Sequence, residues 1–191
     1  GVPTGFDTDV NAAALAEHAA AGGGEGGLAY LTIGTGIGGG LVLDGKPVHG
    51  IAHPEMGHIY PRRHPADQDF AGICPHHGDC LEGLASGPAI IARWGASLSQ
   101  LASDHEAHAV IADYIAQACH VLFASVAAER VVIGGGVAKT AGLVERVATR
   151  SAELSAGYLP GGARHRVLRP ALGEDAGITG AMMLAASVRM A

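Results

Sequence analysis

Two cysteines and two histidines lie close together in segment 74–80, which reads CPHHGDC. Zn²⁺ takes four nitrogen or sulfur ligands tetrahedrally, and the C-x2-H-x2-C spacing lets one tight turn present Cys74, His77 and Cys80 together. His58 ends the preceding extended segment and is the best candidate for the fourth ligand. The alternative is a chance cluster of solvent-facing histidines beside two ordinary cysteines. We expect zinc, because the long irregular segment 51–80 needs something to hold it.

A glycine-rich turn at residues 34–40 can approach phosphate groups closely. It contains the formal dinucleotide-binding glycine pattern, but it joins two predicted strands, and that context excludes a Rossmann site. What remains is a glycine hairpin. Its bare backbone at Gly34, Gly36 and Gly38, together with the Thr35 hydroxyl, can donate hydrogen bonds to phosphate oxygens. The alternative is an ordinary tight turn that tolerates glycine.

A second glycine turn, Gly134-Gly135-Gly136, follows a predicted strand and opens a predicted helix. It is not a Walker A phosphate loop, because Ala138 stands where that motif has the glycine before its lysine. A strand, a glycine turn and a helix N-terminus can still accommodate the base or ribose of a nucleotide against bare backbone.

Asp9 places a carboxylate where the first predicted helix begins. A carboxylate there can take a proton from a substrate hydroxyl during phosphoryl transfer. Asp is also among the residues preferred at helix starts, so its position alone favours a helix cap.

The elements that must position these residues alternate between strands and helices, which predicts an α/β fold. Asp7 or Thr8 can cap the first helix, and Asp44-Gly45 closes a hairpin. We expect strands at 28–33, 40–43, 46–48, 130–133 and 167–168, and helices at 12–21, 81–85, 88–98, 106–128, 138–154 and 176–187.

Composition narrows the class of protein. The 191 residues carry a formal net charge of −6, and the 12 Lys and Arg residues are scattered, which argues against nucleic acid as a partner. Hydrophobic residues make up 48% of the chain, without an uninterrupted apolar run of the roughly 20 residues that cross a bilayer. Three cysteines fit a reduced protein. We therefore expect a cytoplasmic protein without a membrane partner.

Taken in order, several motifs resemble the ROK family of sugar kinases, and the resemblance covers nearly the whole chain. The HPEMGH run and His77 in the metal motif make the bacterial zinc-containing fructokinase branch the most similar. The motifs are Asp9-Val10-Asn11, the turn 34–40, Glu55-Met56-Gly57-His58, Cys80-Leu81-Glu82-Gly83 and the turn 134–136.

The resemblance implies a role for each motif. Asp9 becomes the catalytic base that activates a sugar hydroxyl toward the γ-phosphate of ATP, with Mg²⁺ as the usual partner of ATP. His58 both binds zinc and contacts the sugar, and the same contact role is implied for Asn11, Glu55 and Glu82. The family pattern also implies a homodimer. One departure is Thr8, which stands where the family commonly has an asparagine before the catalytic aspartate.

The resemblance also implies a domain organisation. Residues 1–174 are expected to form the large sugar- and zinc-binding lobe of an actin-like ATPase (ribonuclease H-like) fold. Residues 175–191 are expected to form a C-terminal helix that packs on the small N-terminal lobe. The Asp-x-Gly-Gly-Thr phosphate loop of that small lobe does not occur in this sequence. We therefore expect the small lobe to be absent and residues 1–191 alone to have weak kinase activity or none.

The preferred hypothesis is phosphorylation of fructose to fructose 6-phosphate by ATP. The alternatives are a glucokinase or mannokinase of the same family, or a sugar-sensing transcriptional regulator with a DNA-binding module upstream. Asp9 together with the phosphate-type hairpin favours an enzyme.

Overall fold

The computed structural model describes residues 4–24 and 26–188. Within them, five strands form one mixed sheet in the order β3-β2-β1-β4-β5. β1 runs antiparallel to β2 and parallel to β4, and β4 is parallel to β5. The strands are β1 (Leu28–Ile33), β2 (Ile37–Leu43), β3 (Lys46–Pro47), β4 (Arg130–Gly134) and β5 (Arg166–Leu168).

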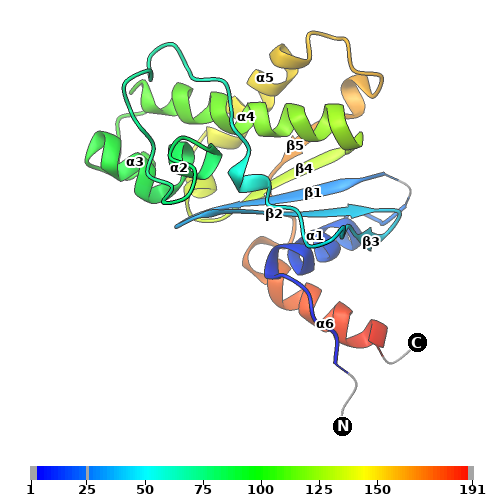
Figure 1. Cartoon of the computed structure of the whole chain (residues 1–191). Coiled ribbons are helices and arrows are strands. Elements are labelled where there is room, and N and C mark those ends of the chain that lie inside the picture. The colour runs from blue at the N-terminus through cyan, green and yellow to red at the C-terminus, as the bar shows by residue number, and fades with distance from the viewer. Residues whose placement is uncertain (1–3, 25, 189–191) are drawn as a thin grey trace.

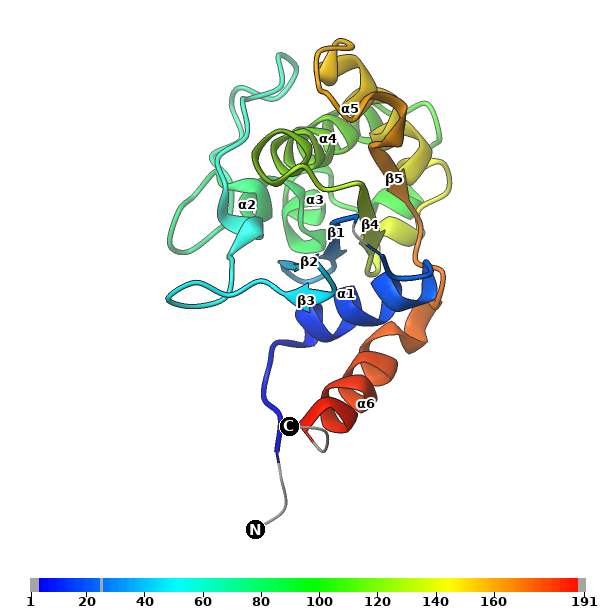
Figure 2. The same ribbon diagram turned by 90° about the vertical axis from the view of Figure 1, so that its right-hand side faces the viewer.

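Helices cover both faces of the sheet (Figures 1 and 2). One face is covered by α1 (Asp9–Ala20), with α6 (Ala176–Val188) stacked against it. The other face carries α2 (Leu81–Ala85), α3 (Gly87–Trp94), α4 (Ala107–Val126) and α5 (Leu143–Ser155). Short 3-10 turns complete the chain: η1 (Met56–His58), η2 (Leu98–Gln100), η3 (Val137–Lys139), η4 (Gly162–Arg164) and η5 (Gly173–Asp175).

Alternate side chains of β1 face the two helical layers, so the core consists of two clusters, one on each face of the sheet. Leu31 and Ile33 point to the larger cluster, where they pack with residues of α4 such as Ile115. Leu28 and Tyr30 point to the smaller cluster formed with α1. Successive side chains of a strand face opposite sides, so one buried strand serves two helical layers. The sheet is therefore covered on both faces.

The helix α4 is long and apolar enough, by length and composition, to cross a membrane. It has 20 residues and a mean hydropathy of 1.5 over its most apolar window. In the structure 61% of that window is buried, and Ile111 and Ile115 are fully buried in the larger core cluster. We therefore read α4 as a core helix.

The fold confirms the predicted α/β class and the existence and type of each predicted element. Most boundaries differ by one to three residues: β2 begins at Ile37 instead of Gly40, and α1 begins at Asp9 instead of Ala12. The boundaries of two helices differ by more. The helix expected at 88–98 ends at Trp94, because Gly95 adopts a left-handed conformation with φ of 75° and caps it. The helix expected to begin at Ala138 begins at Leu143, because the chain first makes the turn η3 and then reverses through Gly142, at φ of 75°.

The helix α6 packs closely on α1. A Cβ atom added at Gly180 would lie 1.8 Å from the carbonyl oxygen of Ala12, so the two backbones approach too closely for a side chain there. The rest of α6 is less covered, with Ile178 and Met182 exposed. The expected docking of segment 175–191 on an N-terminal lobe stays a prediction, and residues 189–191 lie outside the described part of the chain.

Candidate functional site

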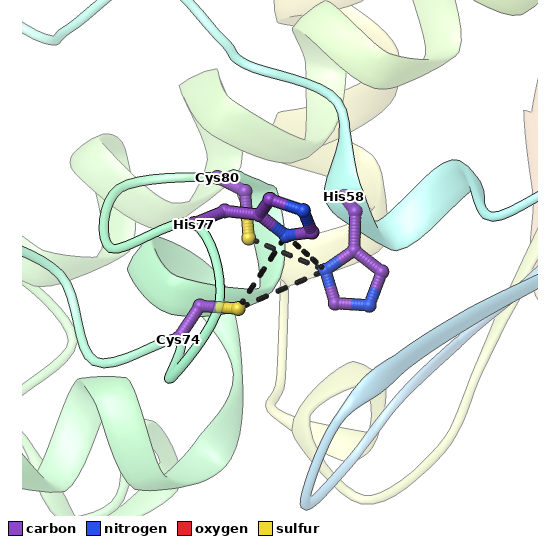
Figure 3. A group of neighbouring side chains, drawn as sticks. All are labelled: His58, Cys74, His77 and Cys80. Atoms are coloured by element: carbon purple, nitrogen blue, oxygen red, sulfur yellow. Dashed lines mark hydrogen bonds between the residues drawn. The ribbon is translucent and has the colours of Figure 1, made fainter.

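Four side chains converge in a cluster that the spacing predicted: His58, Cys74, His77 and Cys80 (Figure 3). His58 ends η1, and Cys80 directly precedes α2. The two imidazole Nδ1 atoms are 3.3 Å apart. Cys74 Sγ lies 3.8 Å from Nδ1 of His58 and 3.7 Å from Nδ1 of His77, and Cys80 Sγ lies 3.5 Å from Nδ1 of His58.

These distances match the edges of a zinc tetrahedron. With Zn–N bonds of about 2.0–2.1 Å and Zn–S bonds of about 2.3 Å, two nitrogens lie about 3.3 Å apart and a nitrogen and a sulfur about 3.5 Å apart. The four candidate atoms all lie within 4.8 Å of one another. The adjacent His76 is exposed and does not belong to the cluster. The donor set and its spacing therefore fit Zn²⁺.

Local backbone contacts shape the turn that carries these ligands. Cys74 and Gly78 exchange both backbone hydrogen bonds, at 3.1 and 2.9 Å, and Gly78 takes a left-handed φ of 61°. A Cβ atom at Gly83 would lie 1.9 Å from the Gly78 carbonyl oxygen, so α2 packs directly under the turn. The backbone N–H of Leu81 donates to the carbonyl of Ile59 at 2.8 Å, which joins the turn to the segment after His58.

The two thiols differ in how readily they ionise. Burial opposes ionisation of Cys74, but hydrogen bonds from the backbone of His76 and His77 outweigh burial and lower the pKa of this thiol. Burial is the largest effect on Cys80 and raises its pKa, and the neighbouring Cys74 raises it further. The thiolate is the form that binds metal.

A cavity of about 470 Å³ lies beside the cluster and gathers most of the other predicted site residues. Its acidic and imidazole side chains come from four places: the start of α1, the segment before η1, the end of η1, and α2. The predicted residues that line it are Asp9, Gly34, Thr35, Gly36, Gly38, Glu55, His58 and Glu82. His58 belongs to both sites: its Nδ1 faces the thiols, and its other ring nitrogen points away from them (Figure 3).

The carboxylate of Glu82 connects α2 to the glycine hairpin. Its Oε2 accepts a hydrogen bond of 2.9 Å from the backbone N–H of Ile37, the first residue of β2. A Cβ atom at Gly36 would lie 2.7 Å from the same oxygen, so a side chain at position 36 would displace this carboxylate. Gly36 is therefore required for the position of Glu82.

Other glycines of the hairpin have a packing role that the phosphate interpretation missed. A Cβ atom at Gly40 would lie 2.3 Å from the carbonyl oxygen of Val10, and one at Gly39 would lie 2.7 Å from the sulfur of Met56. These glycines let α1 and η1 approach β2. A Cβ atom at Gly34 would have no neighbouring atom within 4 Å, and Thr35 is exposed. The tip of the turn is therefore open to a ligand.

Asp9 is not the helix cap. Thr8 holds that position, and its hydroxyl accepts from the backbone N–H of Asn11 at 3.1 Å. Asp9 is the first residue of α1 and is exposed at the cavity, where its Oδ1 accepts from the N–H of Val10 at 2.9 Å. The carboxylate thus lies at the positive end of a helix and remains open to a ligand.

Asn11, the remaining predicted sugar contact, does not line this cavity. It is fully buried, and its amide donates to Asp7 Oδ1 at 2.7 Å and lies 3.3 Å from His49 Nε2. Burial opposes ionisation of Asp7, but hydrogen bonds from Asn11, His49 and Thr8 outweigh it and lower the pKa of the carboxyl. Asn11 thus organises the segment before Asp9. No sequence pattern linked Asp7 with His49, which lie 42 positions apart.

The second glycine turn lines a separate cavity of about 490 Å³. Gly134 ends β4, and a Cβ atom at Gly135, whose φ is 89°, would lie 2.4 Å from the Ile33 carbonyl oxygen at the end of β1. The two glycine turns therefore follow neighbouring parallel strands, at the carboxyl edge where open α/β sheets bind ligands. Lys139 and Glu174 form an ion pair at this cavity, a contact that sequence reasoning missed.

Comparison with known proteins shows what this chain is similar to. The family model described as "ROK family" matches residues 1–188. A fructokinase from Zymomonas mobilis is 48% identical over 189 residues, which is 97% of this chain and 63% of that protein. A fructokinase from Lactococcus lactis is 43% identical over 76% of this chain and 50% of its own length. The structure of a ROK hexokinase from Thermus thermophilus superposes with a TM-score of 0.77 at 32% identity, covering 97% of this chain and 66% of that one.

Proposed function

Because this chain belongs to the ROK family, we propose that the protein transfers the γ-phosphoryl group of ATP to a hydroxyl of fructose. The chain spans 63% of the length of the Zymomonas relative, so the activity of the whole protein is part of this proposal. The observation that carries it is the cavity in which an exposed Asp9, Glu55, His58 and Glu82 lie beside an open glycine turn.

In this proposal Asp9 is the general base. Its carboxylate takes the proton from the sugar hydroxyl, whose oxygen forms a bond to the γ-phosphorus while the bond to the leaving ADP breaks. Glu55 and Glu82 accept hydrogen bonds from other sugar hydroxyls, and the outer ring nitrogen of His58 supplies a directional donor. The hydrogen bond from the backbone N–H of Ile37 holds the carboxylate of Glu82, so the sugar meets a group that is already in place.

The two glycine turns are proposed to hold Mg-ATP. The open tip at Gly34 and Thr35 takes the phosphates, and the cavity at Gly134, Gly135 and Gly136 takes the base or ribose. Their position after the neighbouring parallel strands β1 and β4 supports one nucleotide across both. Lys139 lines the second cavity, where it is paired with Glu174.

Zinc is proposed at His58, Cys74, His77 and Cys80, because their nitrogen and sulfur atoms have the separations of a zinc tetrahedron. When bound, the ion would link both ends of the segment 59–80 through its four ligands. Binding of the ion by Nδ1 would fix the ring of His58 and leave its Nε2–H free to donate to the sugar. The protein is further proposed to be cytoplasmic, in keeping with its three cysteines, and a homodimer, as the resemblance implies.

A substrate panel tests this function. The complete gene product and residues 1–191 are incubated in parallel with Mg-ATP and fructose, mannose or glucose, and ADP release is followed. We expect the highest kcat/KM for fructose with the complete product. Release of ADP with glucose but not fructose would replace fructokinase by glucokinase. Sugar binding without ADP release from the complete product would favour a sugar-sensing regulator and contradict the kinase.

A further inference from the structure

The irregular segment 59–80 is held by a second group of contacts, separate from the metal ligands. Its centre is Asp67, which is only 6% exposed. Tyr114 Oη, from α4, donates to Asp67 Oδ2 at 2.5 Å. Arg93 Nη1, from α3, lies 3.2 Å from the same oxygen as an ion pair. The segment is thus fixed to two core helices through one buried carboxylate.

The partners of Asp67 are themselves held in place. Burial raises the pKa of Tyr114 to about 12, and the bond to Asp67 raises it as well, so the phenol stays a proton donor near neutral pH. The guanidinium of Arg93 lies over the Phe70 ring at 4.0 Å and over the Trp94 ring at 4.5 Å. Such cation–π contacts are stronger for desolvated cations. Removing one partner would leave a buried charge unpaired, which is costly.

Arg63 extends this arrangement to the metal ligands. Its Nη2 donates to the carbonyl oxygens of Asp67 and Phe70, both at 2.5 Å, and its Nε donates to the Asp67 carbonyl at 3.1 Å. Its Nη1 lies 3.3 Å from Oδ2 of Asp79. Asp79 stands between the ligands His77 and Cys80 in the sequence. One planar guanidinium therefore joins the anchored part of the segment to the turn that carries the ligands.

We propose that Arg63 is a positioning residue for the metal site: it holds the turn 74–80 in the geometry that brings the two cysteines and His77 onto His58. This inference rests on the proposed zinc. A turn that is already held loses less conformational freedom when the metal binds, and the affinity is correspondingly higher. Lys could not replace Arg63, because an ammonium lacks the rigid fork that reaches two carbonyls and a carboxylate together.

We expect the loss of Arg63 to lower the affinity for zinc rather than the stability of the whole fold. The side chain of Asp79 is 45% exposed, and half-exposed ion pairs contribute little to folding on their own. The Arg63 side chain is 20% exposed. Arg130 offers a matched control, because its side chain is also 20% exposed and it pairs with one carboxylate, Glu129, and one carbonyl, that of Ala21. It lies at the start of β4, outside the segment 59–80.

The test is the dissociation constant for Zn²⁺, measured by competition with a chromophoric chelator on the wild type, Arg63→Met, Arg63→Lys, Asp79→Asn and Arg130→Met. Thermal unfolding of each apoprotein is measured in parallel. We expect Arg63→Met to weaken zinc binding by about tenfold or more, in the range found for residues that orient ligands. Arg63→Lys and Asp79→Asn should weaken it by several fold, and Arg130→Met should leave it within about twofold of the wild type.

Three outcomes would overturn the inference. Wild-type affinity in both Arg63→Met and Asp79→Asn would remove Arg63 as a positioning residue while leaving the zinc site intact. Equal loss of zinc affinity in Arg63→Met and Arg130→Met would show general destabilisation instead. A wild-type chain that binds no Zn²⁺ would overturn the proposed metal and this inference together. If Arg63→Met does not fold, Asp79→Asn still decides the test. The side chain of Asp79 is half exposed, so its substitution should leave the fold intact.

Discussion

The substitution Gly36→Ala tests whether the hairpin and α2 form one binding site. The backbone at Gly36 does not have a positive φ, so alanine is excluded by neither the turn nor the strand. The added Cβ atom would lie 2.7 Å from Glu82 Oε2, closer than real Cβ contacts allow, so the carboxylate must move. Its 2.9 Å hydrogen bond to the backbone of Ile37 is then lost.

The magnitude follows from that hydrogen bond. A hydrogen bond to a charged group contributes about 1.5–3 kcal/mol, and about 1.4 kcal/mol corresponds to a factor of ten in affinity. If Glu82 contacts the sugar, Gly36→Ala should weaken fructose binding by about tenfold to about a hundredfold. The assay is a calorimetric titration with fructose. Gly50→Ala serves as the control, because the nearest atom to its Cβ is 3.9 Å away.

A double-mutant comparison makes the test specific. In a Glu82→Gln background, Gly36→Ala should cause little additional loss of fructose affinity, because both changes act on the same contact. Fructose affinity in Gly36→Ala equal to that of the wild type would refute the reasoning. Full additivity of the two losses would also contradict it, since the effect of Gly36→Ala would then not pass through Glu82.

His77→Ala should abolish stoichiometric zinc in a metal analysis, whereas His76→Ala should retain it; equal zinc in both would contradict the ligand assignment. Asp7 has a lowered pKa in the folded state, so its stabilisation is fully present above its ordinary value of 3.8 and is lost as pH falls through the folded pKa. The free energy of unfolding of Asp7→Asn should therefore fall less steeply than that of the wild type as the pH drops below about 4. Identical pH profiles of the two proteins would refute this. Ile115→Ala should cost about 2–5 kcal/mol in chemical denaturation, because Ile115 is fully buried, and a loss below about 1 kcal/mol would contradict the core described here.

The sequence predicted those parts of the molecule that depend on local spacing. Cys74, His77 and Cys80 lie within one turn, and their geometry follows from chain connectivity and the left-handed Gly78. The elements of the sheet were also predictable, because a two-residue apolar repeat and turn residues mark them. The exact ends of two helices were not, since they depend on which glycine, Gly95 or Gly142, adopts a positive φ.

Contacts between distant positions were beyond the reach of sequence reasoning. Tyr114 and Asp67 lie 47 positions apart, and no periodicity links them. The same holds for the glycines of the hairpin. Their abundance indicated phosphate binding, but Gly39 and Gly40 are required by the approach of Met56 and Val10, and only the packed structure reveals that requirement. Asn11 was likewise placed in the sugar site by resemblance, whereas its side chain is buried beside Asp7 and His49.

The most direct test of the central claim is the Asp9→Asn variant of the complete gene product. Asparagine keeps the shape of the side chain but cannot accept the proton of the sugar hydroxyl. Two quantities are measured on the same preparation: ADP release with fructose and Mg-ATP, and fructose affinity by calorimetry. We expect kcat to fall by about a hundredfold or more, the range usual for a general base, with fructose affinity within about threefold of the wild type. Wild-type turnover in Asp9→Asn would contradict the assignment of Asp9 as the base and, with it, the proposed mechanism.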